Sequence, residues 1–200
     1  MLFPITLNMA VWLFLSLWLL AAVAVGGSGL LVRIPPPGGG LVLLGLTAGF
    51  LALCTAFKVA RARVDLVDLR VLVLLHATRL AGVYFLIRCE QGDLPYVLAA
   101  PSGWSEITVA ISALLATAIP MRGEIRMHVL LIWNTVGLTN LFFIGLTFVR
   151  IGTSQPWQLS PFQELPLSLF PTFMGPLYLA THVIIYTRLR LKPPETADPK

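Results

Sequence analysis

The hydrophobic and polar positions of this chain alternate in long blocks rather than with a short period. Six apolar runs are separated by short segments that hold most of the charges, prolines and glycines, and each run is long enough for a membrane-spanning helix. They cover residues 5–26, 41–57, 68–88, 104–119, 128–149 and 168–189. The pattern predicts an all-α integral membrane protein, a bundle of about six transmembrane helices. We expect one helical domain over residues 1–191 and a polar tail over 192–200.

Two parts of this pattern leave the local structure open. The apolar piece Tyr96–Ala100 lies between two prolines within 93–101, so it either dips back into the membrane or forms an ordinary interfacial loop. The sixth run contains Pro171, Gly175 and Pro176, which predict a kinked or broken helix near its start.

The first run lacks the basic start of a signal peptide, and we expect it to be retained.

The composition places these helices in a lipid bilayer. The chain is 57% hydrophobic and 12% charged, with a mean hydropathy of +0.85, whereas soluble domains are about 25% charged. A soluble protein of 200 residues could not bury this much apolar surface. The net charge of +5 fits basic loops on one membrane face, so we expect no nucleic acid partner.

The distribution of lysine and arginine predicts the orientation. With six spans, both termini lie on one side. The loops and ends of that side hold ten basic residues: Lys58, Arg61, Arg63, Arg70, Arg122, Arg126, Arg188, Arg190, Lys192 and Lys200. The opposite side holds three, Arg33, Arg88 and Arg150. The positive-inside rule therefore predicts that both termini and the polar tail lie in the cytoplasm.

A small group of polar residues lies inside the apolar runs. Arg79 falls near the middle of the third run, where an unpaired charge costs roughly 2.5–3.5 kcal/mol on insertion scales. We expect it to face protein and to pair with Glu106, because the other acidic candidates, Glu90 and Asp93, lie in a loop. Such a pair is either a structural staple or the anion-binding part of a ligand pocket.

Two histidines reach matching depths on different helices. His76 and His182 both lie roughly 10–12 Å below the cytoplasmic boundary, and Asn134 on the fifth run is nearly level with them. Two such histidines can ligate a haem iron axially or hold a metal ion. They can equally form a proton or polar-ligand site, or make interhelical hydrogen bonds and nothing more.

Motifs of known enzymes are missing from the sequence. There is no HExxH, Walker loop or Cys-x-x-Cys, so whether the protein is an enzyme stays open. We expect a polar cavity that binds a small polar or redox ligand, or that conducts a proton or solute. The alternatives are a non-catalytic accessory subunit of a larger membrane complex with other subunits as partners, and a membrane enzyme acting on a lipid or quinone.

One set of spacings resembles a known pattern. Arg79-x-x-Gly82, Gly92-x-Leu94-Pro95 and Pro101-x-Gly103-Trp104-x-Glu106 are similar to a pattern in uncharacterised bacterial multi-pass membrane proteins, which often have Asp in the place of the glutamate. The resemblance implies a bacterial inner-membrane protein and carries no activity.

Overall fold

The computed structural model of the protein describes residues 9–35 and 37–191. Within these ranges the chain is helical, without a strand. The elements are α1 (Met9–Gly27), η1 (Leu30–Arg33), α2 (Pro37–Ala56), α3 (Lys58–Asp65), α4 (Leu69–Leu75), η2 (His76–Gly82), α5 (Val83–Glu90), α6 (Tyr96–Ala118), α7 (Gly123–Ser154), η3 (Pro156–Gln163), η4 (Phe170–Met174) and α8 (Gly175–Leu191).

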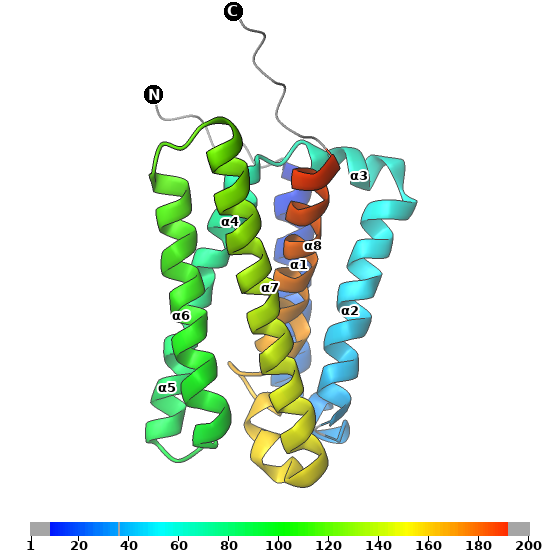
Figure 1. Ribbon diagram of the computed structural model, residues 1–200. Coiled ribbons are helices and arrows are strands. Elements are labelled where there is room, and N and C mark those ends of the chain that lie inside the picture. Colours follow the sequence, from blue (N-terminus) through cyan, green and yellow to red (C-terminus); the bar gives the residue numbers. More distant parts are fainter. Residues whose placement is uncertain (1–8, 36, 192–200) are drawn as a thin grey trace, which may run out of the picture.

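The long helices run alternately up and down and form one bundle, with α3 lying across one end (Figure 1). In the described part of the chain, five helices are long and apolar enough to cross a membrane: Met9–Gly27, Gly38–Ala56, Leu69–Glu90, Tyr96–Ala118 and Gly123–Ser154. The sixth predicted run corresponds to η4 and α8. Although α8 has only 17 residues, it packs against α2, α4 and α7 and completes the bundle.

The fourth helix begins earlier than predicted. α6 starts at Tyr96, directly after Pro95 with its extended backbone (φ −66°, ψ 134°), so the expected loop or re-entrant piece at Tyr96–Ala100 is wrong. Pro101 is the sixth residue of α6, where its ring removes the N–H that would bond to the carbonyl one turn earlier, and the helix continues through it. Glu106 is therefore about 15 Å from the helix start, rather than one turn inside it.

Two segments in the bundle depart from α-helical geometry. The third predicted run is divided into α4, the 3₁₀-helix η2 and α5. A 3₁₀-helix has three residues per turn, so His76, Arg79 and Gly82 align on one side of η2, and all three are buried. The predicted interruption of the sixth run is present as the π-helix η4, which contains Pro171 and precedes α8.

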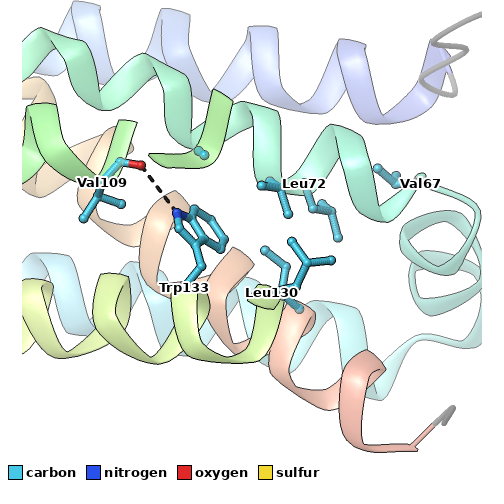
Figure 2. Close-up of a cluster of buried hydrophobic side chains, with 8 residues drawn as sticks. Val67, Leu72, Val109, Leu130 and Trp133 are labelled. Carbon is cyan, nitrogen blue, oxygen red and sulfur yellow. Dashed lines mark hydrogen bonds between the residues drawn. The ribbon is translucent and has the colours of Figure 1, made fainter. Parts of the chain in front are cut away.

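Two hydrophobic clusters occupy the two halves of the bundle. The first, which we call the α3-side cluster, includes Val73, Val109, Ala113, Leu130, Trp133 and Ile185. Figure 2 shows it with the Trp133 indole N–H donating to the Val109 carbonyl oxygen. The second, the η3-side cluster, includes Phe85, Leu98, Ala99, Ile151, Leu159 and Phe162. A buried polar layer lies between the two clusters along the helices.

Candidate functional site

The polar layer brings together all five residues that the sequence singles out. We call His76, Arg79, Glu106, Asn134 and His182 the polar centre; they come from η2, α6, α7 and α8, and each is at most 2% exposed. Residues that lie far apart in the chain thus share one site near the middle of the bundle. This agrees with the high cost of turning polar groups towards lipid.

Arg79 and Glu106 form the expected ion pair. The Arg79 Nε donates to Glu106 Oε2 at 2.9 Å and Nη2 donates to Oε1, so the contact is bidentate. The Asn140 amide also donates to Glu106 Oε1, at 3.1 Å. η2 and α6 cross closely here, because a Cβ at Gly82 would lie only 2.6 Å from the Glu106 Cβ. The pair therefore depends on a close approach of two backbones.

The ion pair continues into a histidine and an amide. Arg79 Nη1 lies 3.2 Å from His182 Nε2. A guanidinium only donates, so Nε2 accepts and the ring proton resides on Nδ1. That N–H donates to Asn134 Oδ1 at 2.8 Å, and the Asn134 amide donates to the His182 carbonyl at 3.1 Å. His182 is thus a neutral histidine with both ring nitrogens engaged.

His76 lies directly against His182 and keeps one nitrogen free. The two ring centroids are 4.2 Å apart, and His76 Nε2 is 3.1 Å from the Thr181 hydroxyl oxygen. His76 Nδ1 is buried and has no hydrogen-bond partner among the described residues. The Trp133 ring packs edge-on against His76 at a centroid distance of 5.2 Å, which closes the α3 side of the site.

This arrangement does not fit an axial haem pair. A porphyrin held by His76 and His182 would have to lie between the two rings, and a centroid separation of 4.2 Å leaves no space for it. His182 also has no free ring nitrogen for a metal ion. Within the described part of the chain, no group of three or more His, Cys, Asp or Glu side chains is placed to hold a metal ion.

A cavity of about 370 Å³ opens beside the ion pair. Its polar lining residues Arg79, Glu106 and Tyr178 lie in an otherwise apolar wall. One side of the cavity is formed by η2 and α5, and the other by residues 166–174, which include η4. The lining residues Ala81 and Val83 are exposed on the side of the bundle. We call this cavity the Arg79 pocket. Its exposed lining, which we call the mouth, lies midway along Leu69–Glu90 rather than at either end of that segment.

Three participants were not anticipated from the sequence. The Tyr178 hydroxyl is 2.9 Å from Thr78 Oγ1, and its ring centroid is 5.5 Å from the Arg79 guanidinium carbon. Asn140 holds Glu106, and an amide inside an apolar run was a signal available for it. Gly137 carries no chemical signal: its carbonyl accepts from Arg79 Nη1 at 3.5 Å, and a Cβ there would lie 2.5 Å from His182 Cε1.

A family model described as a domain of unknown function (DUF8737) matches residues 36–190. The match includes every residue of the polar centre and of the Arg79 pocket, while α1 lies outside it. No curated protein and no solved structure matches the chain. The match agrees with the resemblance to an uncharacterised family.

Proposed function

Because the chain belongs to the DUF8737 family of unknown function, we propose a function from the geometry of the polar centre. The protein binds an uncharged amphipathic small molecule that reaches the Arg79 pocket from the lipid phase. The polar head of this ligand contacts Arg79 and Glu106, and its apolar body lies against the remaining wall.

One observation carries this proposal: the two departures from α-helical geometry form opposite walls of a pocket that ends on a buried ion pair. Long 3₁₀ stretches and π-helices inside longer helices are frequent at functional sites. The pocket volume of about 370 Å³ falls in the range of small-molecule sites, which combine an apolar lining with a few convergent polar groups.

The charges of the site favour an uncharged head. Arg79 and Glu106 neutralise each other, and the neutral His182 adds no charge. An anion would have to compete with Glu106 for the guanidinium. Of the five N–H groups of Arg79, two bond to Glu106 and two point to His182 and Gly137, which leaves one on Nη2 without a partner among the described residues. A carbonyl or hydroxyl oxygen on the ligand is a suitable acceptor.

The packing favours binding over passage of a solute. The α3-side cluster and the η3-side cluster fill the two halves of the bundle above and below the polar centre. A ligand would therefore enter the Arg79 pocket through its mouth on the side of the bundle. A membrane enzyme is less favoured, because both carboxylate oxygens of Glu106 already accept hydrogen bonds, from Arg79 and Asn140. The second candidate function is that of an accessory subunit in a larger membrane complex. It is supported by the exposed faces of α1 and α2, because only 11% of the apolar window of each helix is buried. Lipid covers such faces as readily as a partner does.

We further propose that the protein lies in the bacterial inner membrane with both termini in the cytoplasm. The start of α1 and the end of α8 lie at the same end of the bundle as α3, which holds three of the basic residues (Figure 1). Reporter fusions after Lys200 and within residues 152–158 should report opposite sides of the membrane. A periplasmic signal from the C-terminal fusion contradicts the proposed orientation.

Binding can be tested with probes that differ only in the head. The full chain in a mild detergent is incubated with decanol, decyl-ubiquinone or decanoate, and retention is measured by native mass spectrometry. We expect retention of an uncharged probe, decanol or decyl-ubiquinone, and little of decanoate. Ala81→Phe should block the mouth, whereas Leu80→Phe, on an exposed residue outside the pocket lining, is the matched control. Equal retention by both variants, or no retention of any probe, overturns the proposal.

A further inference from the structure

α3 lies at the boundary of the membrane. It follows α2 after the single extended residue Phe57 and ends shortly before α4, and both neighbours belong to segments that are apolar enough to cross a bilayer. Because those segments leave the hydrocarbon region at these ends, α3 lies at the level of the headgroups. Figure 1 shows it across the end of the bundle instead of along the bundle axis.

The side chains of α3 form two kinds of surface. Val59, Ala62 and Leu66 are spaced i, i+3 and i+7 and thus share one helical face. All three are exposed, and Val59 and Leu66 each have 71% of their surface accessible. Lys58 and Arg63 flank this stripe and Arg61 lies farther round the helix; all three are exposed as well. A short helix with an apolar stripe between cations is typical of helices that lie in the membrane interface.

The cations of α3 have no acidic partners. In the part of the chain that the structure describes, Lys58, Arg61 and Arg63 form no ion pair within 4.0 Å. The acidic residue of the helix, Asp65, lies 3.9 Å from Arg188 instead. Three exposed positive charges at the headgroup level thus remain uncompensated by the residues that the structure describes.

The position of α3 is fixed by the bundle. Arg188 of α8 donates to the carbonyl oxygen of Val67 at 2.6 Å and to that of Val64. These bonds hold the turn between α3 and α4, where the Val64 carbonyl also accepts from the Val67 N–H at 3.0 Å. At the other end, only Phe57 separates α3 from α2. The cations are therefore presented from an anchored helix rather than from a mobile loop.

We propose that α3 binds the headgroups of anionic phospholipids, with Lys58, Arg61 and Arg63 contacting phosphates and the Val59–Leu66 stripe lying against the acyl boundary. Basic residues near a membrane surface are attracted to anionic lipids, and phosphate is the complement of these exposed positive charges. This inference does not depend on the Arg79 pocket or on its ligand.

The test compares lipid classes and two sets of charges. The full chain is reconstituted in nanodiscs of phosphatidylcholine with a minor fraction of phosphatidylglycerol, and the lipids retained after release into detergent are quantified by native mass spectrometry. We expect the wild type to retain phosphatidylglycerol preferentially. The variant Lys58→Gln/Arg61→Gln/Arg63→Gln should lose on the order of a hundredfold in this preference. The control Arg122→Gln/Arg126→Gln/Arg190→Gln removes three cations at the same end of the bundle but outside α3, and should retain most of it.

The wild-type measurement alone decides part of the question and needs no variant to fold. Equal retention of both lipids by the wild type overturns the proposal. An equal loss in the two triple variants also overturns it, because the attraction would then belong to the whole basic end and not to α3. Circular dichroism of each variant before reconstitution identifies any that has lost its helices, and for such a variant the substitutions are made singly and compared in the same way.

Discussion

α1 and α2 differ from the other spans in what holds them to the bundle. Their apolar windows are each 11% buried, compared with 33% for Leu69–Glu90 and for α7 and 44% for α6. Neither α1 nor α2 contains a charged residue, whereas the better buried segments contribute Arg79, Glu106 and Asn134 to the polar centre. Lipid tails are as apolar as leucine, so apolar surface alone gives helices little reason to associate. In this bundle, the spans that contribute residues to the polar centre are also the more deeply buried ones.

The packing beside α2 is also looser than the packing around the polar centre. A groove of about 1080 Å³ separates α2 from the second half of α7, and its wall is largely apolar. Around the polar centre, by contrast, η2 and α6 approach so closely that Gly82 has no room for a Cβ. The central segments are therefore expected to be sensitive to substitution, and α1 and α2 to be tolerant.

The largest effect should come from breaking the ion pair. Arg79→Met leaves the Glu106 carboxylate buried without its partner, and Glu106→Gln leaves the guanidinium without its partner; each should cost about 3–5 kcal/mol of unfolding free energy. The double variant should cost clearly less than the sum. Denaturant unfolding in detergent measures all three. Additive losses would mean that the two side chains do not interact.

A smaller effect is expected from a methyl group in the central bundle. Gly137→Ala places a Cβ 2.5 Å from His182 Cε1, and such overpacking typically costs about 1–3 kcal/mol. Gly145→Ala is the matched control on the same helix, because a Cβ there meets nothing within 4 Å. It should be neutral or slightly stabilising. Thermal unfolding of both variants decides this, and equal losses would contradict the described packing around His182.

The sequence was sufficient to predict the helices and the inward-facing polar residues. Both follow from strong local energies: long apolar runs need lipid, and Arg79 needs a partner. Contacts between helices were less accessible. The depths of His76 and His182 suggested that they could meet, but only the packing of η2 against α8 brings their rings to 4.2 Å.

The helix boundaries and irregular segments were less predictable. Pro101 suggested a loop, but α6 includes it as its sixth residue, so the loss of one backbone hydrogen bond does not end the helix. η2 has the same apolar pattern as an α-helix, so its 3₁₀ geometry leaves no local signature. Tyr178 was missed because tyrosines in apolar runs are usual at interfaces; its role here depends on its neighbour Arg79.

A moderate effect should follow from removing the amide that holds His182. Asn134→Leu leaves the His182 Nδ1–H without its acceptor, and we expect a loss of about 1–2 kcal/mol of unfolding free energy. The comparison is Thr47→Val in α2, since among the described residues the Thr47 hydroxyl bonds only to the Leu43 carbonyl of its own helix. That change should be close to neutral. A larger loss for Thr47→Val would reverse the distinction between the two regions.

The smallest effect concerns the one described side-chain hydrogen bond by which α1 is tied to the rest of the bundle. The Trp18 indole N–H donates to the Thr172 carbonyl at 2.9 Å, within η4. The residue four positions on, Pro176, has no N–H to give to that carbonyl, so the indole supplies a donor that an α-helix would otherwise provide. Trp18→Phe keeps most of the aromatic packing and should cost about 0.6 kcal/mol of unfolding free energy. Trp12→Phe, on a residue that is 56% exposed on the same helix, should cost nothing measurable. Equal unfolding free energies for the two variants would mean that the indole hydrogen bond contributes nothing and that apolar contacts alone hold α1. The difference between α1 and the central segments, which are held by polar contacts, would then be larger.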